Sequence, residues 1–197
     1  DAQLALGYLR HWVYEWNIRD ARTQWKTIME DLTDTTADVF MGLGLQCANC
    51  HNHTYDPLLQ KDYFRLQAFF APILPIDSEL AASIKYADYK SRLRQWELET
   101  ESIRNQIAKI EGPYREKYRN IAINRFPDDL QQIARKPDSE KTPHDVQLAY
   151  LIQRQVQAEY DRLDKYIKGE DKERLVQLKR QLKEHDTAKP DPLPHAM

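Results

Sequence analysis

Apolar residues recur at intervals of three and four along most of the chain, which is the spacing of one face of an α-helix. This pattern predicts helices over residues 2–16, 20–45 and 57–70. The two prolines of the segment 71–75 should end the third helix, because proline lacks a backbone N–H and cannot continue a helix. The first part of the chain is therefore predicted to be helical.

The second part carries apolar residues in a heptad pattern, the signature of helices that pack along a seam. They are Tyr86, Tyr89, Leu93, Trp96, Ile103, Ile107, Ile110, Tyr114, Tyr118 and Ile121. Gly112-Pro113 should kink or break this helix. Thr142-Pro143 has N-cap and first-turn chemistry and should open another helix, with a shorter one after Gly169. We expect the helix from about Ser78 to Ile121 to fold back antiparallel on these later helices.

The predicted fold is all-α, with a chemically active helical segment over residues 1–77 and an antiparallel helical hairpin or coiled-coil-like bundle over 78–197. Composition agrees, because only 5 of 197 residues are glycine and 30% are charged, as in solvated helices. The net charge of -2 gives no general attraction to nucleic acid. No apolar run approaches the roughly 18 residues that span a bilayer. The Pro-rich tail from Lys189 indicates a linker to a further part of a longer chain.

The strongest chemical signal is Cys47-Ala48-Asn49-Cys50-His51, which contains both cysteines of the chain. In c-type haem attachment two thiols at this spacing add to the two vinyl groups of the porphyrin, and the adjacent imidazole becomes an axial ligand of the iron. The motif therefore predicts one covalent haem c, attached at Cys47 and Cys50, with His51 as proximal iron ligand. Asp56, before Pro57, is interpreted as a helix N-cap rather than a group acting at the iron.

Two other interpretations of the motif remain open. Cys47 and Cys50 could form a disulfide or a reactive dithiol, although a thioredoxin-type site expects a strand before the helix. Together with His51 and His53 they could instead bind zinc, although four ligands within seven residues are cramped for a structural zinc site.

The sixth iron ligand is not evident from the sequence, because no methionine lies between Met41 and the terminal Met197. Upstream Met29, Met41 and His11 are the candidates for a distal position. His53 is a candidate for the distal ligand or for a residue that contacts the iron ligands. As a distal ligand it lies too close to His51 to reach easily the opposite face of a haem. Otherwise the sixth position would be empty, water-bound or filled by another part of a longer protein.

The segment from Thr35 to Phe64 resembles the planctomycete-type cytochrome c-like family. The resemblance is carried by the CxxCHxH pattern of residues 47–53, by Asp56-Pro57 and by Lys61-Asp62-Tyr63. It implies Cys47 and Cys50 as haem attachment points and His51 as proximal ligand. It also implies a large exported protein that joins this domain to others, of which the chain would be a part.

Electron transfer by the haem-bearing segment is the leading functional hypothesis, with redox proteins or attached domains as partners. Export to the periplasm or the cell surface of a bacterium would follow, because c-type haem is attached outside the cytoplasm. One alternative is a haem-dependent oxidoreductase module with an open sixth site, although no catalytic residue is predicted. The other is a zinc-clipped or disulfide-clipped helical interaction scaffold.

Overall fold

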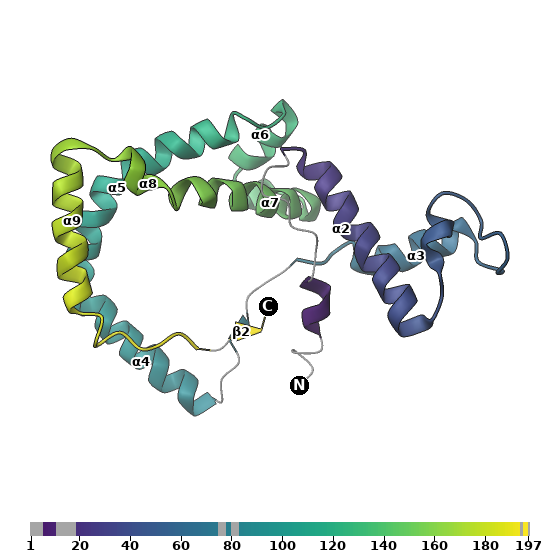
Figure 1. Cartoon of the computed structure of the whole chain (residues 1–197), viewed down its shortest axis with the longest axis horizontal. Helices are drawn as coiled ribbons and strands as arrows, with labels where there is room; N and C mark the ends of the chain where they lie inside the picture. The colour runs from purple at the N-terminus through teal and green to yellow at the C-terminus, as the bar shows by residue number, and fades with distance from the viewer. Residues whose placement is uncertain (1–5, 11–18, 75–77, 80–82, 194, 197) are drawn as a thin grey trace. The chain divides into compact units, whose positions relative to one another are not determined.

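The computed structural model describes residues 6–10, 19–74, 78–79, 83–193 and 195–196, and in these ranges the chain is almost entirely helical (Figure 1). The prediction of an all-α protein is confirmed. Besides the helices, the described residues form two strands of two residues each, β1 (Ser78–Glu79) and β2 (His195–Ala196), which lie antiparallel to each other. The chain divides into two compact units. Unit 1 comprises residues 1–76 and 126–154, and unit 2 comprises residues 77–125 and 155–197. Residues 126–154 thus pack with the first part of the chain, whereas the sequence predicted two consecutive segments, 1–77 and 78–197.

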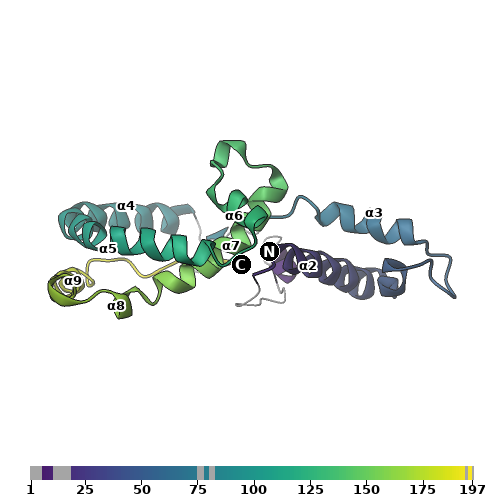
Figure 2. The same cartoon turned by 90° about the horizontal axis from the view of Figure 1, so that it is seen from above.

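Unit 1 is built around the helix α2 (Ala21–Thr36), which packs against α3 (Gln60–Phe70) (Figure 1, Figure 2). The side chain of Asp20 caps α2 by accepting a hydrogen bond from the backbone N–H of Thr23. One face of α2 is buried, through Trp25, Ile28, Met29 and Leu32, and burial of such side chains is the main stabilising contribution to a helix of this length.

The predicted helix over residues 20–45 ends earlier than expected. After Thr36 the chain makes one wider turn, η2 (Ala37–Met41), and then stops at Gly42, whose φ of 63° lies in the left-handed region. Glycine adopts this conformation without steric cost, which makes it the usual residue just beyond a helix end. The chain then forms the short 3-10 helix η3 (Leu45–Asn49), which contains Cys47. Of the helix expected over 2–16, the structure describes only η1 (Leu6–Arg10), a 3-10 helix.

Segment 126–154 completes unit 1 with α6 (Asp128–Arg135), η4 (Asp138–Glu140) and the first turns of α7 (Pro143–Tyr160). Two polar contacts tie this segment to the first part. Arg22 donates to Asp129 at 2.7 Å, and the amide of Gln147 donates to the carbonyls of Ala71 and Ile73 at 2.6 and 2.9 Å. As predicted, Thr142 caps α7, through a reciprocal hydrogen-bond pair with Asp145.

Unit 2 contains α4 (Ser83–Glu99), α5 (Glu101–Ile123), the last turns of α7, α8 (Leu163–Tyr166) and α9 (Gly169–Glu184). The single long helix expected from Ser78 is thus two helices that divide at Thr100. Of the kink or break expected at Gly112-Pro113, the break does not occur, because α5 continues through Pro113. The proline removes only one backbone hydrogen bond, and the packing of α5 against α8 and α9 outweighs that loss.

Helices α5 and α9 run antiparallel, because Tyr114 bonds Asp171 while the earlier Gln106 bonds the later Arg174. The heptad residues of α5 are half-buried, except Ile121, which is exposed. The rings of Tyr118 and Tyr166 stack at 3.8 Å between centroids. The Pro-rich tail also belongs to unit 2. Lys189 lies over the ring of Trp96 and Pro190 is buried, so this part of the tail is packed and not a free linker.

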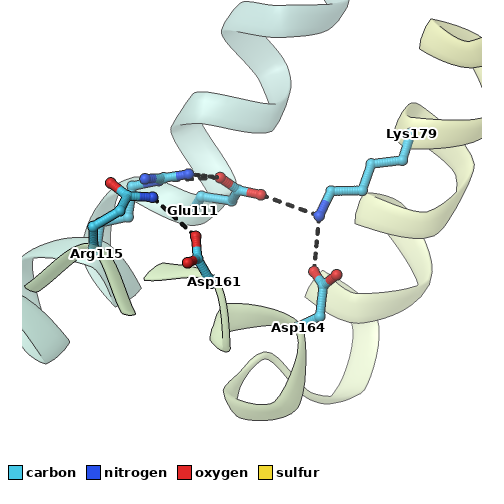
Figure 3. A network of polar contacts seen from close by, with 6 residues as sticks. Glu111, Arg115, Asp161, Asp164 and Lys179 are labelled. Carbon is cyan, nitrogen blue, oxygen red and sulfur yellow. Dashed lines mark hydrogen bonds and ion pairs between the residues drawn. The ribbon is translucent and has the colours of Figure 1, made fainter. Parts of the chain in front are cut away.

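A buried carboxylate, Glu111, connects three helices of unit 2 (Figure 3). It pairs with Arg115 of α5 at 2.9 Å and with Lys179 of α9 at 3.3 Å, and Lys179 also reaches Asp164 of α8 at 2.8 Å. Burial by itself would lower the pKa of Lys179, but Asp164 and Glu111 raise it above its ordinary value. The side chain of Glu111 is 9% exposed, so both its oxygens need these cations.

Replacing this carboxylate should therefore weaken unit 2. We expect Glu111→Ala to lower the free energy of unfolding by about 1.5–3 kcal/mol, the usual contribution of hydrogen bonds to charged groups. Glu116→Ala, which removes an exposed carboxylate of the same helix, should stay within about 0.5 kcal/mol of the parent chain. Urea unfolding followed by circular dichroism measures both, and equal effects of the two substitutions would contradict the assigned role of Glu111.

Candidate functional site

Residues Cys47 to His51 form one helical turn, the cysteine turn, at the surface of unit 1. The backbone N–H of Cys50 bonds the carbonyl of Cys47, and the N–H of His51 reaches the same carbonyl at 3.5 Å. Residues three and four positions apart on such a turn share a face. Cys47, Cys50 and His51 are therefore held together on one side, and both thiols are free and exposed.

The tautomer of the His51 ring, that is, which ring nitrogen carries the proton, is set by the next residue, Asn52. Nδ1 of His51 lies 2.7 Å from the carbonyl oxygen of Asn52. A carbonyl oxygen only accepts hydrogen bonds, so Nδ1 carries the proton and Nε2 keeps its lone pair. This is the arrangement of a metal-binding histidine, in which the nitrogen that does not bind the metal donates to a backbone carbonyl and orients the ring. His51 is exposed, so its Nε2 is accessible.

His53 has the opposite arrangement. Its Nδ1 accepts hydrogen bonds from the backbone N–H groups of Asp56 and Tyr55, at 2.9 and 3.4 Å. In the neutral ring Nε2 must then carry the proton, which leaves no free lone pair for a metal. The backbone N–H of His53 also bonds the carbonyl of Leu58. His53 thus shapes the loop between η3 and α3.

The interpretation of Asp56 as a helix N-cap is wrong, because α3 begins at Gln60. The N–H groups that a cap would serve are taken by other side chains. Asp62 accepts from the N–H of Leu59 at 3.1 Å, and Asn52 accepts from the N–H of Gln60 at 2.9 Å. The carboxylate of Asp56 instead lies 3.3 Å from Nδ1 of His53, with which it forms an ion pair only when that ring is protonated.

Gln60 is a site residue that the sequence did not reveal. Its side-chain amide donates to the carbonyls of Asn49 and Cys50 at 3.1 and 3.0 Å, directly before His51. These carbonyls belong to the end of a short helix and need a donor from outside it. A glutamine ten residues after the second cysteine carries no recognisable sequence signal, because its role depends on how α3 packs against the turn.

Below the turn, a small hydrophobic cluster joins η2, η3 and α3. It consists of Ala37, Leu45, Ala48 and Tyr63, with Leu58 and Leu66 packed against them. Two side-chain hydrogen bonds add to it, from Asn49 to Glu30 and from Gln46 to Asp38. The second bond brings η2 beside the turn, and η2 presents three consecutive exposed apolar side chains, Val39, Phe40 and Met41.

The structure separates the other predicted ligand candidates. Met41 is 51% exposed in η2, whereas Met29 is 7% exposed and lies on the buried face of α2. Met29 also lines an open cavity of about 680 Å³ between α2, α3 and the start of α7, together with Trp25, Phe64 and His144. None of the cysteine-turn residues lines this cavity. His11 lies outside the described residues.

A ready-made zinc site is not found in the described part of the chain, where no three or more His, Cys, Asp or Glu side chains gather to hold a metal ion. The tautomer of His53 also argues against the four-ligand arrangement that the zinc interpretation needs. Among the described helices, none is both long and apolar enough to cross a membrane.

Residues 1–74 match the family PSCyt2, described as protein of unknown function (DUF1549). This match overturns the resemblance to the planctomycete-type cytochrome c-like family, and a family of unknown function supplies neither a cofactor nor an activity. No curated protein and no solved structure matches the chain.

The role of His53 can be tested in protein produced without haem attachment. We expect His53→Ala to speed amide hydrogen exchange at Tyr55 and Asp56, because both N–H groups lose their acceptor, and to cost about 0.5–1.5 kcal/mol of stability. His51→Ala is the matched control, since its ring contacts only the carbonyl of Asn52. Unchanged exchange in the His53 variant would show that the loop holds without this side chain.

Proposed function

We propose that the chain carries one haem c, bound covalently through Cys47 and Cys50 with Nε2 of His51 on the iron, and that it transfers electrons within a larger exported protein. The observation that carries the proposal is the His51 ring, whose Nδ1–H···O=C bond to Asn52 leaves Nε2 free beside two exposed thiols on the same turn. Bound there, the haem supplies a one-electron carrier.

The residues around the turn fit this group. Each thiol can add across one vinyl group to form a thioether, and neither needs to leave a disulfide first, because both cysteines are free. The exposed side chains of Val39, Phe40 and Met41 offer an apolar border beside the turn, and a porphyrin edge would remove such surface from water. Gln60 and Asn52 hold the backbone on either side of His51.

The position of the cysteine turn outside the lining of the large cavity in unit 1 favours electron transfer over an enzymatic role. The cavity of about 680 Å³ in unit 1 is lined by residues other than Cys47, Cys50 and His51, so a substrate held there would not contact the cysteines. In this proposal unit 2 serves as a spacer or docking arm, and redox proteins or attached domains are the partners. Export to the periplasm or cell surface would follow, since the thioethers are made outside the cytoplasm.

The test is haem staining of a denaturing gel, on protein exported from a host with working attachment machinery. We expect the wild type to stain, because thioethers survive denaturation, and the double variant Cys47→Ala/Cys50→Ala to lose the stain. His51→Ala should change the reduced absorption spectrum through loss of the proximal ligand, whereas His144→Ala, at another exposed histidine of unit 1, should leave both stain and spectrum unchanged. A wild-type chain without haem would refute the proposal.

A further inference from the structure

Tyr63, of the hydrophobic cluster below the cysteine turn, and two residues at the end of α2 carry buried polar atoms that lack partners. In the described part of unit 1, Asp34 Oδ1, Thr36 Oγ1 and the Tyr63 hydroxyl are buried without a hydrogen bond of regular geometry. Tyr63 is 0% exposed, and its hydroxyl comes from α3 towards the carboxylate of Asp34 on α2. Leaving such groups unpaired is costly, so their persistence at one place calls for an explanation.

The charges around Asp34 favour its protonated form. Burial, and then the carboxylates of Asp38 in η2 and of Glu30 and Asp31 in α2, raise the pKa of Asp34, while the Tyr63 hydroxyl lowers it. Burial and the nearby Asp34 also raise the pKa of Tyr63 above its ordinary value, so the phenol keeps its proton. The carboxyl is thus the member of the pair that can gain or lose a proton.

We propose that Asp34 and Tyr63 form a proton-binding site beneath the cysteine turn, and that proton uptake at Asp34 accompanies reduction of the haem. This inference rests on the function proposed above. The proton-binding site and the cysteine turn are connected through one hydrophobic cluster. Tyr63 belongs to the same cluster as Ala48, which lies between the two cysteines in sequence.

The direction of the coupling follows from charge. One electron from an external reductant removes one positive charge from the turn, so the negative charge on Asp34 is less stabilised and its carboxylate takes one proton from solvent. The pKa of Asp34 is then higher in the reduced protein than in the oxidised protein. Between these two values the midpoint potential falls as the pH rises, by at most about 59 mV per unit for a one-electron couple.

The experiment is a potentiometric titration of the haem-loaded protein between about pH 4 and 8, with dithionite as reductant. The wild type should show an interval in which the potential falls with pH, and in Asp34→Asn the slope in that interval should fall to the part that the haem propionates contribute. Asp31→Asn removes a carboxylate from the same helix, one turn earlier, and should keep the interval, moved slightly to lower pH because Asp31 raises the pKa of Asp34. Tyr63→Phe removes the hydroxyl that lowers the pKa of Asp34 and should move the interval to higher pH. The haem propionates titrate in every variant, so they do not affect the comparison.

The outcomes separate the two proposals. Haem staining with the same pH slope in the wild type and Asp34→Asn would overturn the proton site and leave the haem proposal standing. Absence of stain in the wild type would overturn both. If Asp34→Asn does not fold, an unshifted interval in Tyr63→Phe refutes the site and a shift to higher pH supports it.

Discussion

The ring of Tyr63 fills the space between α2, α3 and the cysteine turn, and the other contacts of this region depend on it. The ring is fully buried and packs with Ala37, Leu45 and Ala48, which come from the two short helices that follow α2. Its position brings the start of α3 against the turn, where Gln60 and Asn52 can complete the backbone hydrogen bonds. A single buried aromatic side chain thus holds both the surface turn and the loop that follows it.

Two histidines, two residues apart, have different roles because their surroundings fix opposite tautomers. His51 faces a carbonyl and keeps a free Nε2, whereas His53 faces two backbone N–H groups and uses its Nδ1 as acceptor. The chemical identity of the side chain is the same in both cases. What differs is the backbone group presented to Nδ1, and that depends on the path of the loop.

The two units are stabilised differently. In unit 1 the hydrophobic cluster lies below the cysteine turn, and Oδ1 of Asp34 and the Tyr63 hydroxyl lack hydrogen bonds of regular geometry. Unit 2 buries a carboxylate, but satisfies it with two cations from two helices. A buried charge with partners tends to define one arrangement of helices, whereas a buried acid without a regular partner can respond to a change of charge nearby.

The sequence by itself determined the all-α class and the cap of α7 at Thr142, and it supplied the Cys47, Cys50 and His51 motif on which the haem proposal rests. These properties are local, since helical periodicity, caps and a five-residue motif depend on neighbours in the chain. The tertiary structure decided where helices end, at Gly42 and Thr100 rather than at Leu45 and Pro113, and that residues 126–154 pack with unit 1. It also decided the contacts of His53 and Gln60 and the surroundings of Asp34, because each depends on a backbone group or side chain whose position is set only when α3 packs against α2 and the turn.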